Sequence, residues 1–148
     1  FPITAFAQAY VQTWDLVDSG KHLDYDGNST YMSYINTGAA TWNAYKSGVI
    51  RKDSAFVVED VYVSDVNASN GWAGMTYSSG KIELNTYYMS GYSNSKKQNV
   101  ATHELGHALG LDHSTSTDVM DAAITGHTST QALSQNDKDS YDAAYNNY

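Results

Sequence analysis

Cysteine is absent from this 148-residue chain, and proline occurs only once, at Pro2. Without cysteine the chain can form no disulfide, no thiolate metal site and no cysteine nucleophile. No apolar run approaches the roughly 20 residues that span a bilayer, so we expect no membrane insertion. The length fits one domain over residues 1–148, which can bury roughly two-thirds of its unfolded surface.

Basic residues are also scarce, with eight Lys and Arg against sixteen Asp and Glu, and the formal net charge is −8. A field of this sign repels phosphate, so we expect no binding to nucleic acid or to an anionic membrane. Charged residues make up only 16% of the chain, whereas Ser, Thr, Asn, Gly and Tyr are abundant. This composition is typical of a secreted bacterial protein, and we expect an extracellular monomer.

A helix is predicted from about Thr30 to Ser47, because apolar residues recur there at three- and four-residue intervals. Asn28 or Ser29 can cap its start, and Gly48 can end it. The apolar residues in question are Tyr31, Ile35, Ala39, Trp42 and Tyr45.

Strands are predicted in three other stretches. Residues 21–30 indicate a short strand that ends in a turn at Asp26–Asn28. Residues 55–66 are rich in β-branched side chains and predict a largely buried strand. Residues 71–85 predict two strands joined at Ser78–Gly80. The opening stretch, residues 1–15, has no clear period, and a helix, a strand or the remnant of a longer segment are all open.

Two further helices carry start signals. Ser95 with Gln98, and Ser134 with Asp137, have the spacing of capping boxes, and Gly110 can end the first of these helices. The first is apolar around much of its circumference, as expected of a central buried helix. The residues expected to be buried are Val100, Ala101, Leu105, Ala108 and Leu109 on the first, and Tyr141, Ala144, Tyr145 and Tyr148 on the second.

Three of the five histidines lie within "HELGHALGLDH", residues 103–113. On a helix, positions i and i+4 are about 400° apart, so His103 and His107 project from the same face. Gly110 can adopt the left-handed conformation that reverses the chain and returns His113 beneath the first two imidazoles. The spacing H-E-x-x-H-x-x-G-x-x-H therefore predicts a tripod of ring nitrogens.

Three nitrogen ligands without a fourth protein ligand are typical of a catalytic zinc, with water in the open position. Glu104 faces the same cleft and can take the proton of that water as a general base. The alternative is an ordinary helix surface with a histidine pair and a solvated glutamate. A surface helix has no reason to supply Gly110 and His113 in register, so we predict one catalytic zinc on His103, His107 and His113.

This stretch resembles the extended zinc motif of the metzincin metalloproteases, and His113–Ser114 is most similar to the matrixin branch, the matrix metalloproteinases and their bacterial relatives. Met120 stands where that family's Met-turn forms an apolar floor beneath the imidazoles. Residues 133–145, "LSQNDKDSYDAAY", resemble the start of the family's C-terminal helix, with Asp137 at an acidic position there.

The resemblance implies an α+β fold with a twisted, mostly parallel sheet, one antiparallel edge strand, and two long helices beneath it. It implies an N-terminal subdomain over residues 1–113 and a small C-terminal subdomain over residues 114–148. It also implies a zinc-dependent endopeptidase acting on proteins or peptides. Because an edge strand offers unpaired backbone groups, we expect substrate to bind along Gly74, Met75, Thr76 and Tyr77.

The sequence departs from the vertebrate members of that family in several places. No His/Asp cluster is evident that could build their second zinc site or their calcium loops. "AITGHTS", residues 123–129, replaces the usual segment after the Met-turn, so the S1′ wall is altered. Asn136 stands before Asp137 where paired aspartates are frequent, which argues against the N-terminal ammonium latch.

The remaining candidate sites have weaker support in the sequence. Asp24, Asp26 and Asn28 place oxygen ligands at alternate positions, and an ordinary turn is preferred there over calcium binding because no later glutamate follows. His22 and His127 are interpreted as surface residues, with a place in the specificity pocket as the alternative for His127. A rival function is a zinc-dependent binding module without turnover, against which the intact Glu104 argues.

Overall fold

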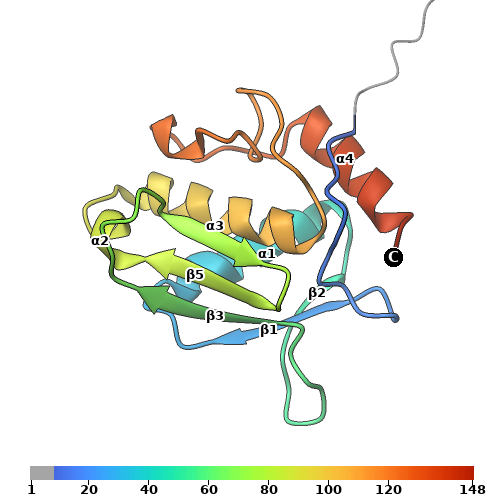
Figure 1. Cartoon of the computed structure of the whole chain (residues 1–148). Coiled ribbons are helices and arrows are strands. Elements are labelled where there is room, and N and C mark those ends of the chain that lie inside the picture. Colours follow the sequence, from blue (N-terminus) through green and yellow to red (C-terminus); the bar gives the residue numbers. More distant parts are fainter. Residues whose placement is uncertain (1–8) are drawn as a thin grey trace, which may run out of the picture.

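The centre of the molecule is a five-stranded sheet in the order β2-β1-β3-β5-β4. The computed structural model describes residues 9–148. β4 runs antiparallel to β5, whereas the other neighbouring pairs are parallel (Figure 1). The predicted mixed sheet with one antiparallel edge strand is therefore confirmed. The strands are β1 (Leu23–Gly27), β2 (Ile50–Lys52), β3 (Val61–Val66), β4 (Gly74–Tyr77) and β5 (Lys81–Asn85).

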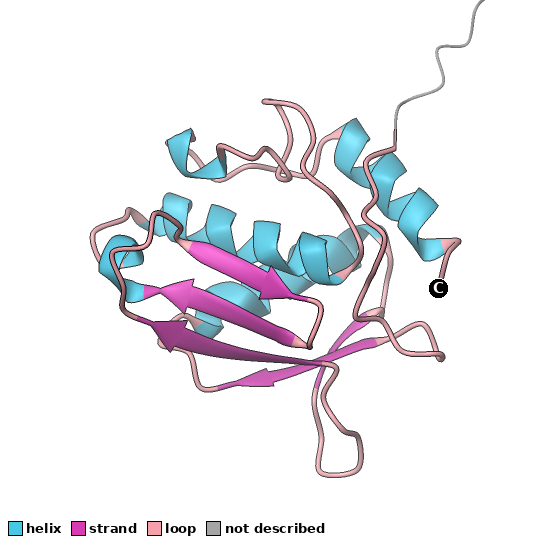
Figure 2. Ribbon diagram, in the orientation of Figure 1, coloured by secondary structure: helices cyan, strands magenta, loops and turns pink. Residues whose placement is uncertain are grey.

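Two long helices, α1 and α3, pack against each other and cover one face of the sheet (Figure 2). Their buried side chains meet those of the strands in one apolar core, with Trp42, Leu105, Leu23 and Ile82 all fully buried. This agrees with the two helices predicted beneath the sheet. The helices are α1 (Met32–Tyr45), α2 (Thr86–Met89), α3 (Asn94–Ala108), the 3-10 turn η1 (Ile124–Gly126) and α4 (Gln135–Tyr145).

The chain after α3 lies on the opposite side of that helix from the strands in Figure 1, ending in α4. Tyr141 of α4 is fully buried and meets Trp42 of α1 edge to face, with ring centroids 5.6 Å apart. Of the other residues predicted to be buried there, Ala144 is buried and Tyr145 and Tyr148 are partly buried. α3 is thus enclosed between the sheet and the C-terminal segment, which explains why its middle turns are buried on every side.

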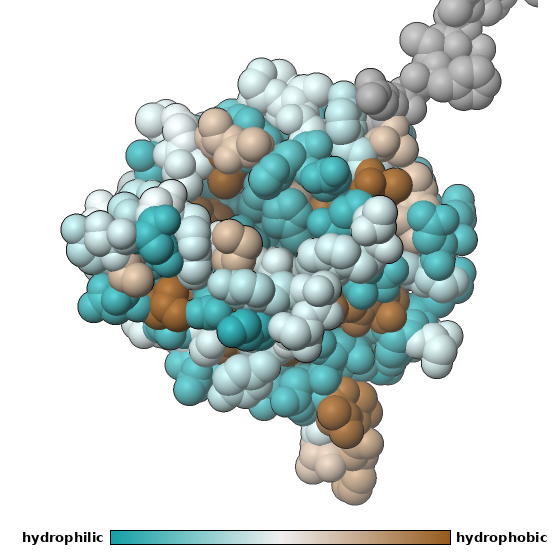
Figure 3. Space-filling view, viewed as in Figure 1, coloured by the Kyte–Doolittle hydropathy of each residue, from teal (hydrophilic) through white to brown (hydrophobic). Residues whose placement is uncertain are grey.

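The predicted strand over residues 55–66 is wrong in its first half. Only Val61–Val66 form β3, whereas the preceding residues make a projecting loop. Phe56 is 97% exposed and Val58 84% exposed, and this loop forms the apolar protrusion at the lower edge of Figure 3. The β-branched composition was a poor guide because no neighbouring strand or helix covers these side chains.

Two predicted helix caps are also wrong. α1 begins at Met32 after Tyr31, without a side-chain cap, although the Ser29 hydroxyl accepts a hydrogen bond from the Tyr31 amide. α3 is capped by Ser93, whose hydroxyl accepts from the Lys96 amide at 3.2 Å, and not by Ser95. The predicted capping box at the start of α4 is confirmed, with Ser134 and Asp137 satisfying each other's backbone amides.

The described part of the opening stretch forms neither a helix nor a named strand. It pairs with the segment after α3, through a bridge between Val11 and Leu111 and hydrogen bonds that join Tyr10 and Gln12 to Asp112 and Gly110. Residues 1–8 of that stretch, with the ammonium latch considered above, lie outside the described residues. Over residues 9–148, no helix combines the length and apolarity required to cross a membrane.

Candidate metal centre and active site

The chain reverses its direction directly after the last turn of α3. Gly110 has a φ of +99°, and the amides of Gly110 and Leu111 donate to the carbonyls of His107 and Gly106, each at 3.0 Å. This pattern is a Schellman motif, in which the residue after the cap takes the left-handed conformation. The reversal predicted at Gly110 is confirmed, and it directs the chain back towards the helix face that carries His107.

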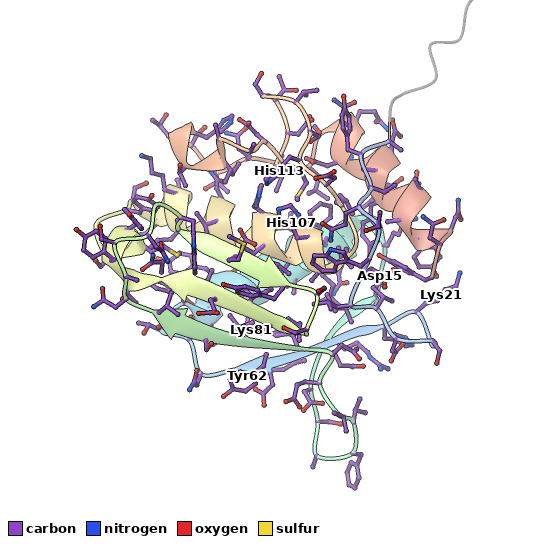
Figure 4. All side chains as sticks on the ribbon, in the orientation of Figure 1. Asp15, Lys21, Tyr62, Lys81, His107 and His113 are labelled. Atoms are coloured by element: carbon purple, nitrogen blue, oxygen red, sulfur yellow. The ribbon has the colours of Figure 1, made fainter. Side chains whose placement is uncertain are left out.

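The three predicted imidazoles meet at one point. The Nε2 atom of His107 lies 3.1 Å from Nε2 of His103 and 3.2 Å from Nε2 of His113. Figure 4 shows His107 and His113 projecting into the same space. Tetrahedral zinc with Zn–N bonds of about 2.0–2.1 Å separates its ligand nitrogens by roughly 3.3 Å. The donor set and its spacing therefore fit one zinc ion.

The other ring nitrogens of two imidazoles are held by backbone carbonyls. His103 Nδ1 lies 2.8 Å from the Val119 carbonyl, and His107 Nδ1 lies 2.8 Å from the Leu111 carbonyl. A carbonyl oxygen only accepts, so each Nδ1 carries the proton and each Nε2 presents a free lone pair. Burial lowers the pKa of His103 to about 4 and also lowers the pKa of His107, which keeps both rings neutral, as metal binding requires.

Met120 fills the space below α3. A Cβ atom added at Gly106 would lie 2.3 Å from the Met120 sulfur, so the absent side chain at that position allows the thioether to approach the helix. Met120 is fully buried, and the preceding residue, Val119, carries the carbonyl that holds His103. The structure thus places Met120 beneath the turn of α3 that separates His103 from His107.

Asp137 joins the C-terminal helix to this turn. Its carboxylate accepts hydrogen bonds from the Val119 amide at 2.8 Å, the Met120 amide at 3.2 Å and the Ser134 amide at 2.9 Å. Burial raises the pKa of Asp137, and these backbone donors partly offset that effect. The resemblance to the family's helix had marked the residue only as an acidic position, whereas the structure shows that it fixes the backbone on which His103 rests.

A second buried carboxylate, Asp118, closes the loop that follows His113. It accepts from the Thr115 amide at 2.8 Å and the Thr115 hydroxyl at 2.7 Å. Burial acts to raise the pKa of Asp118, but hydrogen bonds from surrounding groups, those of Ser134 and Thr115 foremost, hold it at about 2. The folded chain therefore favours the charged form of this residue more strongly than the unfolded chain does.

Acidification should remove this contribution. The ordinary pKa is 3.8, so the charged carboxylate stabilises the fold above about pH 4 and its contribution fades as the pH falls towards about 2. We expect the difference in unfolding free energy between wild type and Asp118→Asn to shrink between about pH 6 and about pH 3. Denaturant titrations of both proteins measure this difference, with the exposed Asp26→Asn as control. A difference that stays constant with pH would contradict the assignment.

A cleft of about 580 Å³ lies between β4 and the C-terminal segment and exposes the imidazoles. Three of the four residues predicted to bind substrate, Gly74, Met75 and Thr76, line it, whereas Tyr77 does not. His127 does not line it either, and its ring lies 2.7 Å from the Asp121 carboxylate. Lining residues that the sequence did not single out for this role include Gln12, Trp14, Trp72, Tyr88 and Tyr92.

Gln12 connects the N-terminal segment to the helix that carries two of the histidines. Its side-chain amide donates to the His107 carbonyl at 2.6 Å, and its backbone amide donates to the Gly110 carbonyl at 2.9 Å. The His107 carbonyl lies in the last turn of α3, where carbonyls lack partners within the helix, and Gly110 lies two residues past the end of that helix. No local pattern could have predicted this role, because the two segments are almost one hundred positions apart.

Glu104 lies in the same cleft, next to β4. Its carboxylate is buried and accepts a hydrogen bond from the Thr76 hydroxyl at 2.6 Å. Burial raises the pKa of Glu104, and the neighbouring imidazoles and the Thr76 hydroxyl partly offset this shift. Glu104 thus places a carboxyl group with a raised pKa beside the three imidazoles.

A second group of carboxylates lies outside the cleft, although the sequence showed no His/Asp cluster able to build a second zinc site or calcium loops. Asp18, Asp24 and Asp60 lie close enough together to hold a cation. Arg51 forms a two-point ion pair with Asp24, at 2.8 and 2.9 Å, and Asp60 accepts from the Asp24 amide. Asp18 accepts from the Gly20 and His22 amides. All three carboxylates therefore have partners within the protein, and we assign no metal ion to them.

An H-E-x-x-H helix with a third histidine returned by a glycine turn, set beneath a mixed sheet, defines a zinc metallopeptidase. The profile of the matrixin peptidases (Peptidase_M10) matches residues 5–146, and the chain belongs to this family. The resemblance found in the sequence is therefore confirmed. No curated protein sequence matches the chain.

Two solved structures are similar to this fold. Archaemetzincin from Methanopyrus kandleri superposes with a TM-score of 0.61 at 12% identity, covering 88% of this chain and 99% of that one. High choriolytic enzyme 1, a hatching-enzyme zinc protease from the medaka Oryzias latipes, gives a TM-score of 0.37 at 18% identity, covering 71% of this chain and 50% of that one. The first of these supports the metzincin-type architecture.

Proposed function

We propose that this matrixin is an endopeptidase that binds one zinc ion through His103, His107 and His113 and uses Glu104 as its general base. The observation that carries the proposal is the convergence of three Nε2 atoms, 3.1 and 3.2 Å apart, in a cleft that also contains Glu104. Zinc on three imidazoles lowers the pKa of a bound water towards about 7 and polarises a carbonyl oxygen.

The residues of the chain supply the remaining steps. Glu104 accepts the proton of the attacking water as the new C–O bond forms at the peptide carbon, and it delivers that proton to the leaving amine as the C–N bond breaks. The carbonyls of Val119 and Leu111 hold the His103 and His107 rings in the tautomer that leaves Nε2 free. The apolar contacts of Met120 support α3 from below.

The substrate is proposed to extend the sheet along β4. This strand forms the edge of the sheet on the side of the cleft. Just before it, the Ala73 carbonyl accepts a hydrogen bond from the Asn85 amide at the end of β5. Because antiparallel pairing alternates, the backbone groups of Gly74 and Thr76 face away from β5 and towards an incoming peptide. An extended peptide can pair with these groups with little demand on its side chains.

The low charge content and the polar composition support secretion as a monomer.

This binding mode predicts an alternating pattern. In substrate peptides carrying one N-methylated amide each, methylation should raise KM by on the order of 10-fold or more at every second position. The positions between, whose amides face away from β4, should be little affected. Steady-state kinetics across such a series, with unmodified peptide as reference, measure this. A uniform effect, or none, would exclude pairing with β4.

Exposure to an unstructured peptide library tests the proposed activity itself. Cleavage products mapped by mass spectrometry should appear at internal peptide bonds, should be lost with a chelator and should return with zinc. A protein that binds peptides without cutting any of them would instead be a zinc-dependent binding module.

A further inference from the structure

Two residues of β4 lie against the Glu104 side chain. Gly74 and Thr76 lie two positions apart in the strand and therefore share one face of it, the face turned to α3. A Cβ atom added at Gly74 would lie 2.9 Å from Glu104 Cγ and 3.1 Å from Glu104 Oε1. The Thr76 hydroxyl lies 2.6 Å from Glu104 Oε2. One residue thus leaves room for the carboxylate, and the other binds it.

The Thr76 hydroxyl has two acceptors within reach, Glu104 Oε2 at 2.6 Å and the Glu104 carbonyl at 2.9 Å. A hydroxyl carries a single proton, and a hydrogen bond to an ionised oxygen is shorter and stronger than one to a neutral carbonyl. The shorter distance therefore assigns the proton to Oε2. Within residues 9–148, no other side chain donates a hydrogen bond to this carboxylate.

We propose that Thr76 is a positioning residue for the proton transfer: it holds Glu104 by Oε2 and so leaves Oε1 to face the water and the scissile bond. Gly74 allows this orientation because it has no side chain. The inference rests on the proposed role of Glu104 as general base. β4 then has two roles. It binds the peptide backbone, and it fixes the carboxylate of Glu104 relative to that backbone.

Loss of the hydroxyl should affect turnover more than binding. A carboxylate released from Thr76 can rotate away from the attacking water, so fewer of the bound complexes are ready to react. The backbone of Thr76, which is the part proposed to pair with substrate, is unchanged by such a substitution. We therefore expect kcat to fall and KM to stay nearly constant.

The matched variants are Thr76→Ser and Thr76→Ala, which both lose the methyl group and differ only in the hydroxyl. Thr76→Ala should lower kcat roughly 10- to 100-fold relative to Thr76→Ser, the usual effect of a hydrogen bond to a charged group. Thr76→Val, which keeps the shape of threonine, should behave like Thr76→Ala. KM and zinc content should match the wild type in all three, and Thr37→Val on the exposed face of α1 serves as a control.

A Glu104→Ala background separates positioning from a purely structural role. There the carboxylate is gone, so Thr76→Ala should cause no further loss beyond that of Glu104→Ala. An equal loss in both backgrounds, or a rise in KM at constant kcat, would overturn the inference, as would equal kcat values for Thr76→Ser and Thr76→Ala. If Glu104→Ala itself cleaves like the wild type, the proposed function fails. If only the Thr76 variants are unaffected, the positioning role alone fails.

Discussion

Glu104→Ala should bind zinc as the wild type does and cleave peptides slower by a factor on the order of 10² to 10⁴, the usual contribution of a positioned general base. The substitution removes the proton acceptor but leaves all three imidazoles and both carbonyls that orient them. The Thr76 hydroxyl can still donate to the carbonyl of residue 104, so the cleft should keep its shape.

Parallel assays of peptide cleavage and of metal content measure this effect. Glu59→Ala is the matched control, because Glu59 is exposed in the projecting loop and does not line the cleft; it should cleave normally. A binding module makes a different prediction, since it has no wild-type turnover to lose and its peptide binding should survive the substitution. Wild-type cleavage by Glu104→Ala would rule out the proposed mechanism.

His113→Ala should lose both zinc affinity and activity. Its ring supplies one of the three converging Nε2 atoms, and two imidazoles alone do not make the three-ligand site of a catalytic zinc. We expect cleavage to fall to near the background rate and zinc to dissociate during dialysis against a mild chelator. Because the ring is less buried than that of His103, the fold should survive the substitution.

The control for this prediction is His22→Ala, which removes an imidazole that lies outside the cleft. It should retain full zinc content and activity. Elemental analysis, circular dichroism and peptide cleavage, measured on wild type, His113→Ala and His22→Ala, separate metal loss from unfolding. A His113→Ala protein that keeps one tightly bound zinc would show that the ligand set is different.

The metal centre could be predicted because its parts are close in sequence. His103 and His107 share a helix face by geometry alone, and Gly110 is a residue whose conformational freedom has a clear local use. The antiparallel edge strand was also predictable, since β4 and β5 are joined by the short turn at Ser78–Gly80. In each case the information lies within about ten residues.

The parts that could not be predicted depend on distant contacts. Gln98 has the spacing of a capping-box partner, yet its side chain donates to the Tyr34 carbonyl at 2.9 Å and the Thr102 hydroxyl at 3.1 Å, so Ser93 caps the helix instead. The approach of Gln12 to His107 and of Thr76 to Glu104 likewise arises only once the segments pack. The residues that hold the site therefore emerge from the fold and not from the motif.

Zinc titration of metal-depleted protein tests the central claim most directly. The account predicts that peptide cleavage is absent from the depleted protein, rises in proportion to added zinc and reaches its maximum at one zinc per chain, with no gain from a second. Cleavage that persists at full rate without metal, or that requires two zinc ions per chain, would contradict it.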